Sequence, residues 1–339
     1  MILAATILLV LLSNCYTRQL QLPELATRFH VKLITDKKLD LIRQGDLDVL
    51  VELDRHGLLM GPGETVAAFA ERLEALRGNM QEFTSEIDAA GEVEVFDIAL
   101  EKSSTIPRDA FRSAQQLTGE LYDFEIDWVP GFYTNKRMGL LFAGCALYSS
   151  DDYFALFIVR KAFEKKERWL IYSRTELLAH ELCHIAHMGF NVVDFEEMFA
   201  YQTSPSRFRR AIGGLFRTPM DSYAVLGSTF LLAGAQIVNR LYLGMVPIYQ
   251  FPISLFAMIV IVCFGVVGGR YLKSLSIYGR ARARLRELVD EVPARAILFR
   301  CSGAEIREIA DTAEPRAWLV GRAEQDIRWR VILHKYPIR

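Results

Sequence analysis

Hydrophobic positions recur at helical spacing in the first third of the chain. Residues 66–76 follow the turn-forming stretch 61–65, and their apolar side chains lie three and four positions apart. This spacing is typical of an amphipathic helix with a defined start. Residues 16–130 as a whole are charged and mostly helical in pattern, so we expect a packed helical subdomain there.

The middle of the chain has a pattern that predicts β-strands. Residues 140–148 and 153–160 are apolar runs separated by a short polar stretch, and residues 169–172 predict a third short strand. An aromatic turn at residues 128–133 is expected to link the helical subdomain to this sheet. Strands next to helices of this kind predict an α+β fold.

Two helices are predicted after the strands. Residues 172–190 contain no glycine or proline before Gly189, and a glycine there suits the C-cap of a helix. Residues 191–201 form a second helical segment that begins with acidic side chains, which the helix dipole favours. Both helices belong to a domain that we expect to span residues 131–220.

Two long uncharged segments predict a transmembrane hairpin at residues 221–270. The run 222–238 has 17 residues without a charge, and the run 241–269 has 29. Since about 20 apolar residues cross a bilayer, the region is long enough for two helices. Pro247 and Pro252 disfavour a continuous helix and place the turn within residues 239–252. The alternative is a hydrophobic hairpin buried in a soluble domain.

Residues 1–14 form a further apolar stretch. Residues 1–15 are therefore either a membrane anchor or a signal, the latter as a signal peptide or as a lipoprotein signal ending at Cys15. No basic residue precedes the apolar stretch, and Asn14 suits neither a small-residue cleavage site nor a lipid-attachment motif. These features favour an uncleaved anchor.

The residues after the hairpin predict a small α+β module at 271–339. A basic helix at 275–289 begins at the membrane, where its arginines would meet anionic lipid. Ser302 and Glu305 form a capping box that opens a short helix. We expect three short strands in this module, at residues 296–300, 318–320 and 328–334.

The distribution of charge orients the chain in a membrane. Ten basic residues flank the hairpin, whereas its loop has only Arg240. By the positive-inside rule both flanks are cytoplasmic, which predicts a multi-pass protein of the cell membrane with residues 131–220 and 271–339 in the cytoplasm. The five cysteines are odd in number and dispersed, which agrees with a reducing compartment. A net charge of −1 argues against binding to nucleic acid.

The candidate chemistry lies in the sequence His180-Glu-Leu-Cys-His184, an HExxH motif on the predicted helix 172–190. Side chains at positions i and i+4 share a face of a helix, so His180 and His184 can present two imidazoles to one Zn²⁺ ion. Glu181 can then act as a general base on a water bound to the metal. Cys183 lies off this stripe and is interpreted as a small core residue.

A catalytic zinc site needs a third protein ligand from another element. His187 lies seven residues from His180, about 10 Å along the helix, which is too far for both to reach one ion. Three interpretations of His187 remain open: a residue that supports the metal ligands from behind, a residue at the rim of the site, or a polar position on the helix. The helix 191–201 offers Glu196 and Glu197, of which only one can face the metal.

An HExxH motif followed on a later helix by Glu-x-x-Ala, here Glu197 to Ala200, resembles the gluzincin class of zinc metallopeptidases. The resemblance implies that Glu197 is the third ligand, with Glu196 as the competing candidate. It also implies a zincin-like domain, in which a small sheet with an exposed edge strand lies beside the HExxH helix and binds a peptide substrate by strand addition. Tyr201 is a candidate for stabilising the transition state, although an ordinary packed tyrosine is the commoner case.

The sequence therefore predicts a membrane-bound, Zn²⁺-dependent peptidase whose partners are a protein or peptide substrate and the lipid bilayer. Two alternatives stay open. One is a non-enzymatic membrane protein with a structural or regulatory metal site, and the other is an outward-facing protease with a cleaved signal. The oligomeric state has no signal in the sequence.

Overall fold

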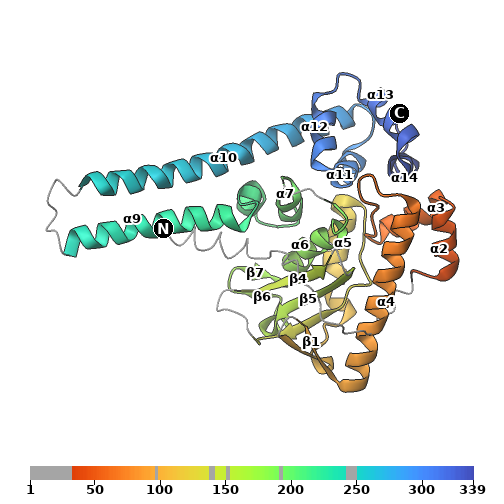
Figure 1. Ribbon diagram of the computed structural model, residues 1–339, viewed down its shortest axis with the longest axis horizontal. Coiled ribbons are helices and arrows are strands. Elements are labelled where there is room, and N and C mark those ends of the chain that lie inside the picture. The colour runs from red at the N-terminus through yellow and green to blue at the C-terminus, as the bar shows by residue number, and fades with distance from the viewer. Residues whose placement is uncertain (1–32, 96–97, 137–141, 150–152, 191–193, 242–249) are drawn as a thin grey trace.

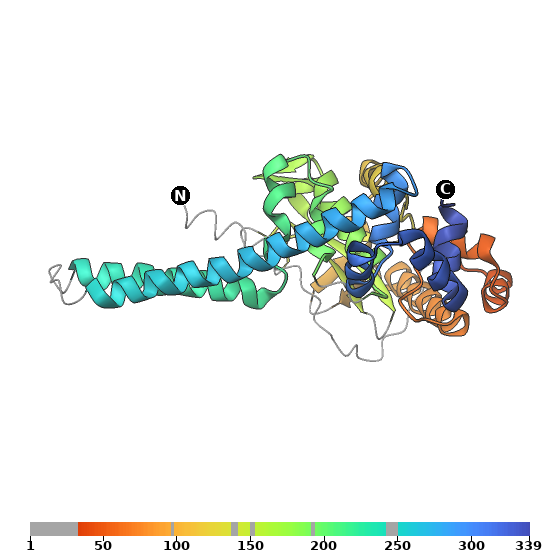
Figure 2. The same cartoon turned by 90° about the horizontal axis from the view of Figure 1, so that it is seen from above.

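The structure of the protein, a computed structural model, combines a mostly helical α+β body with two long helices that project from it (Figures 1 and 2). The predicted anchor at residues 1–14 lies outside the described residues. The residues described are 33–95, 98–136, 142–149, 153–190, 194–241 and 250–339.

Helices dominate the N-terminal part of the body. Helices α2 (Asp36–Arg43), α3 (Leu47–Arg55) and α4 (Val66–Ala90) each begin at an N-cap whose side chain accepts a backbone N–H bond. The predicted helix 66–76 is confirmed, and α4 extends it until Gly91 ends the helix with a φ of +76°. A short β-hairpin, β1 (Glu92–Val95) and β2 (Ile98–Glu101), and helix α5 (Arg112–Tyr122) follow. Single 3₁₀ turns occupy Lys102–Ser104, Arg108–Ala110, Lys161–Phe163 and Gly213–Leu215.

The central sheet has three strands in the order β3-β5-β4. Strand β3 (Gly131–Thr134) runs parallel to β5 (Phe154–Arg160), and β4 (Gly144–Ser149) runs antiparallel to it. The strands predicted at 140–148 and 153–160 are confirmed as β4 and β5. The aromatic turn predicted at 128–133 is only partly a turn, because its residues 131–133 belong to β3. The third predicted strand is a two-stranded hairpin, β6 (Arg168–Trp169) and β7 (Tyr172–Ser173). Strand β4 is an edge of the central sheet, and it lies against the HExxH helix.

The HExxH helix, α6 (Arg174–Ala186), is shorter than predicted at both ends. The helix begins at Arg174, directly after β7. Ser173 is its N-cap, and the Ser173 hydroxyl accepts the N–H of Glu176. The expected C-cap at Gly189 is wrong, since His187 occupies the C-cap and its N–H bonds three preceding carbonyls. Helix α7 (Glu196–Tyr201) follows, and residues 191–193 of the predicted second helix lie outside the described residues.

Helix α8 (Arg207–Ile212) leads into the two long helices, α9 (Pro219–Leu241) and α10 (Gln250–Arg286), which run side by side (Figures 1 and 2). Both are long and apolar enough to cross a membrane. Only 17% of the most apolar stretch of α9 and 6% of that of α10 is buried. The alternative of a hydrophobic hairpin buried in a soluble domain therefore does not describe these helices. The separate basic helix expected at 275–289 is the last part of α10. Pro252 lies in the first turn of α10, where a proline is tolerated.

The C-terminal module is helical throughout, so the predicted α+β module and its three strands are wrong. Short apolar runs cannot distinguish a buried strand from a buried helix, and here helical packing is realised. The predicted capping box of Ser302 and Glu305 is confirmed. The helices are α11 (Glu291–Phe299), α12 (Gly303–Asp311), α13 (Pro315–Gln325) and α14 (Ile327–Lys335).

These C-terminal helices close the core against the N-terminal part of the chain. One cluster of buried apolar side chains extends from Ile34 to Tyr336. Within it the guanidinium of Arg300 donates to both carboxylate oxygens of Asp54, and Nζ of Lys335 donates to Asp54 at 2.7 Å. Burial raises the pKa of Asp54, but the two cations outweigh it and hold the pKa below its usual value.

Candidate metal centre

Helix α6 places two buried imidazoles side by side. His180 and His184 lie one turn apart, and their Nε2 atoms approach to 3.1 Å. Only 8% of His180 and 5% of His184 is exposed to solvent. Two ring nitrogens this close can share one proton or one cation.

Glu197 of α7 completes a triangle of donor atoms. Its carboxylate oxygens lie 3.6 Å from Nε2 of His180 and 3.7 Å from Nε2 of His184. Donors bound about 2.0–2.1 Å from a tetrahedral ion are roughly 3.3 Å apart, so the three side chains are spaced as ligands of one ion would be. Oε2 of Glu197 is buried and accepts no hydrogen bond. His180, His184 and Glu197 therefore form a group that could hold a metal ion.

Glu196, the competing candidate for third ligand, contacts the other side of the same imidazole. Its Oε1 atom lies 2.8 Å from Nδ1 of His184. With Nδ1 of His184 facing Glu196, its Nε2 faces Glu197 and His180. A carboxylate in this position fixes the tautomer of a metal-binding histidine and raises its basicity. The two adjacent glutamates thus have different places in the site.

The protonation of the group reflects burial and close charges. Burial, together with the charge of His184, lowers the pKa of His180 well below its usual value, so this imidazole is neutral. Burial lowers the pKa of His184 too, but Glu196 outweighs it and raises the pKa to about 10. Burial raises the pKa of Glu197 to about 7, against the attraction of His184. A divalent cation would relieve this crowding of buried carboxylates.

Glu181 is held between the helix and the sheet. The N–H of Ala146 in β4 donates to Oε2 of Glu181 at 2.9 Å. The N–H of Ala146 therefore points away from β5, toward the open edge of the sheet. Glu181 itself is 3% exposed and lines the same pocket as His180.

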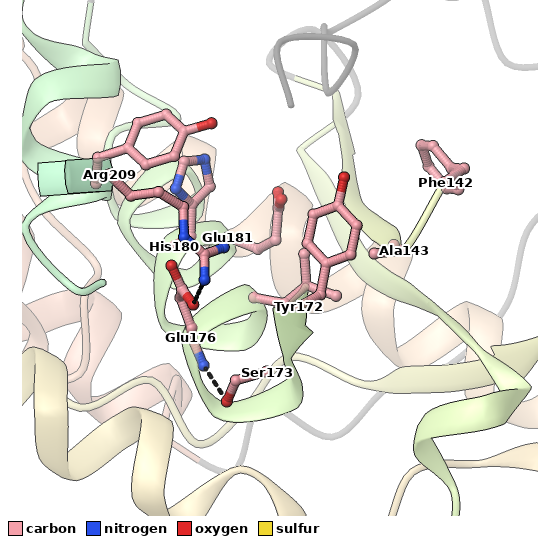
Figure 3. A pocket seen from close by; sticks show the side chains of 11 residues that line it. Phe142, Ala143, Tyr172, Ser173, Glu176, His180, Glu181 and Arg209 are labelled. Carbon is pink, nitrogen blue, oxygen red and sulfur yellow. Dashed lines mark hydrogen bonds and ion pairs between the residues drawn. The ribbon is translucent and has the colours of Figure 1, made fainter. Parts of the chain in front are cut away.

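That pocket lies between α6, the sheet edge, β7 and α8 (Figure 3). It contains about 510 Å³ of empty space, open solvent at its mouth included. Phe142 and Leu177 are apolar lining residues of the pocket. An ion pair between Glu176 and Arg209 lies beside His180, with 2.8 Å between Oε2 and Nη2 (Figure 3). The pocket is open to solvent, so a substrate can approach His180 and Glu181 through it.

Tyr201 also lines the pocket, on the side of α7. Its ring makes an edge-to-face contact with His180, with 4.7 Å between centroids. Burial raises the pKa of Tyr201 well above its usual value, so the phenol stays protonated and can donate a hydrogen bond. Gly213 lies against the ring, and a Cβ there would come within 2.0 Å of it.

The structure places His187 and Cys183 outside the ligand group. His187 is buried rather than at a rim or on a polar face, and its Nε2 lies 2.7 Å from the carbonyl oxygen of Phe299 in α11. The two rings stack at 4.0 Å. Burial lowers the pKa of His187 to about 4, so the ring is a neutral donor. Cys183 is fully buried in the core, as expected.

Replacing His187 by alanine should lower stability without removing a metal ion. The change leaves the buried carbonyl of Phe299 without its partner and opens a cavity, which together cost about 2–4 kcal/mol. Thermal denaturation and metal content of the purified His187→Ala protein test this. Metal loss equal to that of His184→Ala would place His187 in the site.

Three residues of the site were missed by the sequence interpretation. Glu176 had a signal, since it lies four positions before His180 on the same helical stripe. Arg209 and Ala146 had none, because only the tertiary structure brings α8 and β4 to this helix.

Comparison of the chain with models of protein families, with curated proteins and with solved structures finds no match.

Proposed function

We propose that this protein is a membrane-bound, zinc-dependent peptidase. The observation that carries the proposal is the triangle of two Nε2 atoms and one carboxylate, 3.1–3.7 Å on a side, with Glu181 in the adjoining pocket. Two histidines and one glutamate are the ligand set of several catalytic zinc sites, which leave a fourth position open. Within the described residues the group has three such donors and no fourth, which favours a catalytic over a structural ion.

In this proposal each residue of the site has a separate role. His180, His184 and Glu197 hold the ion, which when bound supplies a Lewis acid and lowers the pKa of a coordinated water. Glu181 accepts a proton from the attacking water and delivers it to the amine nitrogen as the peptide bond breaks. Glu196 keeps His184 in the binding tautomer. Tyr201 donates a hydrogen bond to the oxygen that gains negative charge.

The sheet edge supports a peptide as the substrate. Strand β4 lies at the edge of a small sheet and next to α6, the arrangement implied by the gluzincin resemblance. The N–H groups of Gly144 and Ala146 point the same way, away from β5, and the Ala146 N–H donates to Glu181. An extended peptide pairing with this edge would pass beside His180 and Glu181.

Zinc dependence tests the proposal directly. The purified full-length protein is expected to carry about one zinc per chain and to cleave a casein or peptide-library substrate. Removal of zinc with 1,10-phenanthroline should abolish cleavage, and added Zn²⁺ should restore it. Zinc-free protein that cleaves at the full rate would contradict the proposal, as would zinc-loaded protein that cleaves neither substrate.

We further propose that α9 and α10 cross the cell membrane and that the metal centre faces the cytoplasm, on the basis of the ten flanking basic residues. Cysteines introduced one at a time at Glu164, Met245 and Ala313 test the orientation in intact cells. Native Cys15, Cys145 and Cys263 are replaced by serine for this purpose. Only Met245→Cys should react with an impermeant thiol reagent. Reaction at Glu164→Cys and Ala313→Cys instead would place the site outside.

A further inference from the structure

Large apolar side chains are exposed around the mouth of the metal-centre pocket. Leu170, in the turn between β6 and β7, is 63% exposed and Ile171 is 44% exposed. Phe208 of α8 is 64% exposed. We call these three residues the pocket rim. Ile171 and Phe208 directly precede Tyr172 and Arg209, which line the pocket.

One arginine joins the two parts of the pocket rim. Nη2 of Arg209 donates to the carbonyl oxygen of Ile171 at 3.1 Å, and the same nitrogen pairs with the buried carboxylate of Glu176 at 2.8 Å. The turn between β6 and β7 is thereby fixed to α8 next to His180. Single exposed apolar residues are common on soluble proteins, but these three are gathered at one opening.

Strands β6 and β7, whose turn carries Leu170 and Ile171, lie on the side of the body from which α9 and α10 project (Figure 1). Helix α8 is separated from α9 only by the Gly213–Leu215 turn and three further residues. Met220 and Tyr223, one turn apart at the start of α9, are also exposed. If the membrane surface lies at the first turns of α9, it also lies close to the pocket rim.

The charges beside the pocket rim suit an anionic lipid surface. Helix α8 has three arginines and no acidic residue, and of these Arg209 is paired with Glu176 while Arg207 is exposed. Exposed Lys165, Lys166 and Arg168 precede the β6–β7 turn, accompanied by Glu164 and Glu167. Basic side chains near a membrane each gain about 1 kcal/mol from anionic headgroups.

We propose that the pocket rim inserts into the headgroup region of the membrane that α9 and α10 cross. The pocket then opens at the membrane surface, and its substrates are polypeptide segments that lie next to a membrane span. The lipid contact rests on the pocket rim and the hairpin, whereas the substrate class also rests on the proposed peptidase function.

Lipid-borne quenchers test the contact without any need for activity. The full-length protein, with Cys15, Cys145 and Cys263 replaced by serine, receives one cysteine at Leu170 or at Phe208 and an NBD label. It is reconstituted in vesicles of phosphatidylcholine and phosphatidylglycerol that contain a nitroxide at the headgroup. Quenching of at least about twofold is expected, because an interfacial side chain lies roughly 5–10 Å deep.

Val320 provides the matched control, as an exposed apolar residue of α13, which lies by the C-terminal end of α10 and away from the part of α10 that projects (Figure 1). The label at Val320→Cys should not be quenched. Quenching at Leu170→Cys and Phe208→Cys that is no stronger than at Val320→Cys would overturn the lipid contact.

The substrate class is tested with one cleavable peptide sequence, tethered to a lipid anchor through either a short or a long spacer. Faster cleavage of the short-spacer peptide is expected, by about tenfold, since the tether raises its concentration at the pocket. Equal rates would overturn the substrate class. Cleavage of neither peptide would count against the peptidase function, while the quenching result would still decide the lipid contact.

Discussion

Replacing Glu181 by glutamine is expected to reduce peptide hydrolysis by at least about 100-fold while bound zinc and the fold are retained. The amide keeps the size of the carboxylate but cannot accept the proton of the attacking water. Its oxygen can still accept the Ala146 N–H that now holds Oε2 at 2.9 Å, so the β4–α6 contact should survive. Initial rates and zinc content of the same preparation measure both quantities.

A suitable control for this variant is Glu120→Gln, which makes the same change on the exposed face of α5. It should leave the rate unaltered. An undiminished rate in Glu181→Gln would show that Glu181 is not the base. Loss of zinc from that variant would assign it to the ligands instead.

The adjacent residues Glu196 and Glu197 should respond differently to the same substitution. Glu196→Gln removes the carboxylate that orients His184, which costs about 10- to 100-fold in metal affinity at sites of this kind. Glu197→Gln removes the charged ligand that lies 3.6 and 3.7 Å from the two Nε2 atoms, so a larger loss is expected. Competition with a chelating dye measures both dissociation constants.

This pair of variants has its own control, because the two positions differ by one residue and the chemical change is identical. A general weakening of α7 would affect both variants alike. If Glu196→Gln loses zinc more severely than Glu197→Gln, then Glu196 is the ligand and the arrangement of α7 differs from the one described.

The sequence predicted the parts of the fold that carry strong local signals. The HExxH spacing placed His180 and His184 on one helical face, and the long uncharged runs predicted the paired helices α9 and α10. The roles assigned to the site residues remain predictions. A gluzincin-like pattern selected Glu197, and the structure brings this residue to the two histidines.

Tertiary packing determined what the sequence could not predict. Residues 296–300 have the apolar character of a strand, yet they lie at the end of α11, where Phe299 stacks on His187 and Arg300 pairs with Asp54. The place of Glu196 beside Nδ1 of His184 depends on how α7 docks on α6, which no local pattern specifies. The same is true of Arg209, whose partners Ile171 and Glu176 come from other elements.

The contacts of Arg300 and Phe299 also impose an order of events during synthesis. The ribosome makes α3, with Asp54, and α6, with His187, well before it makes α11, and the two long helices lie between them in the chain. Until α11 emerges, Asp54 lacks the cation that compensates its burial, and His187 lacks its acceptor. The body that holds the metal site is therefore completed only after α9 and α10 have left the ribosome. If α9 and α10 cross a membrane as proposed, their insertion can precede assembly of the group formed by His180, His184 and Glu197.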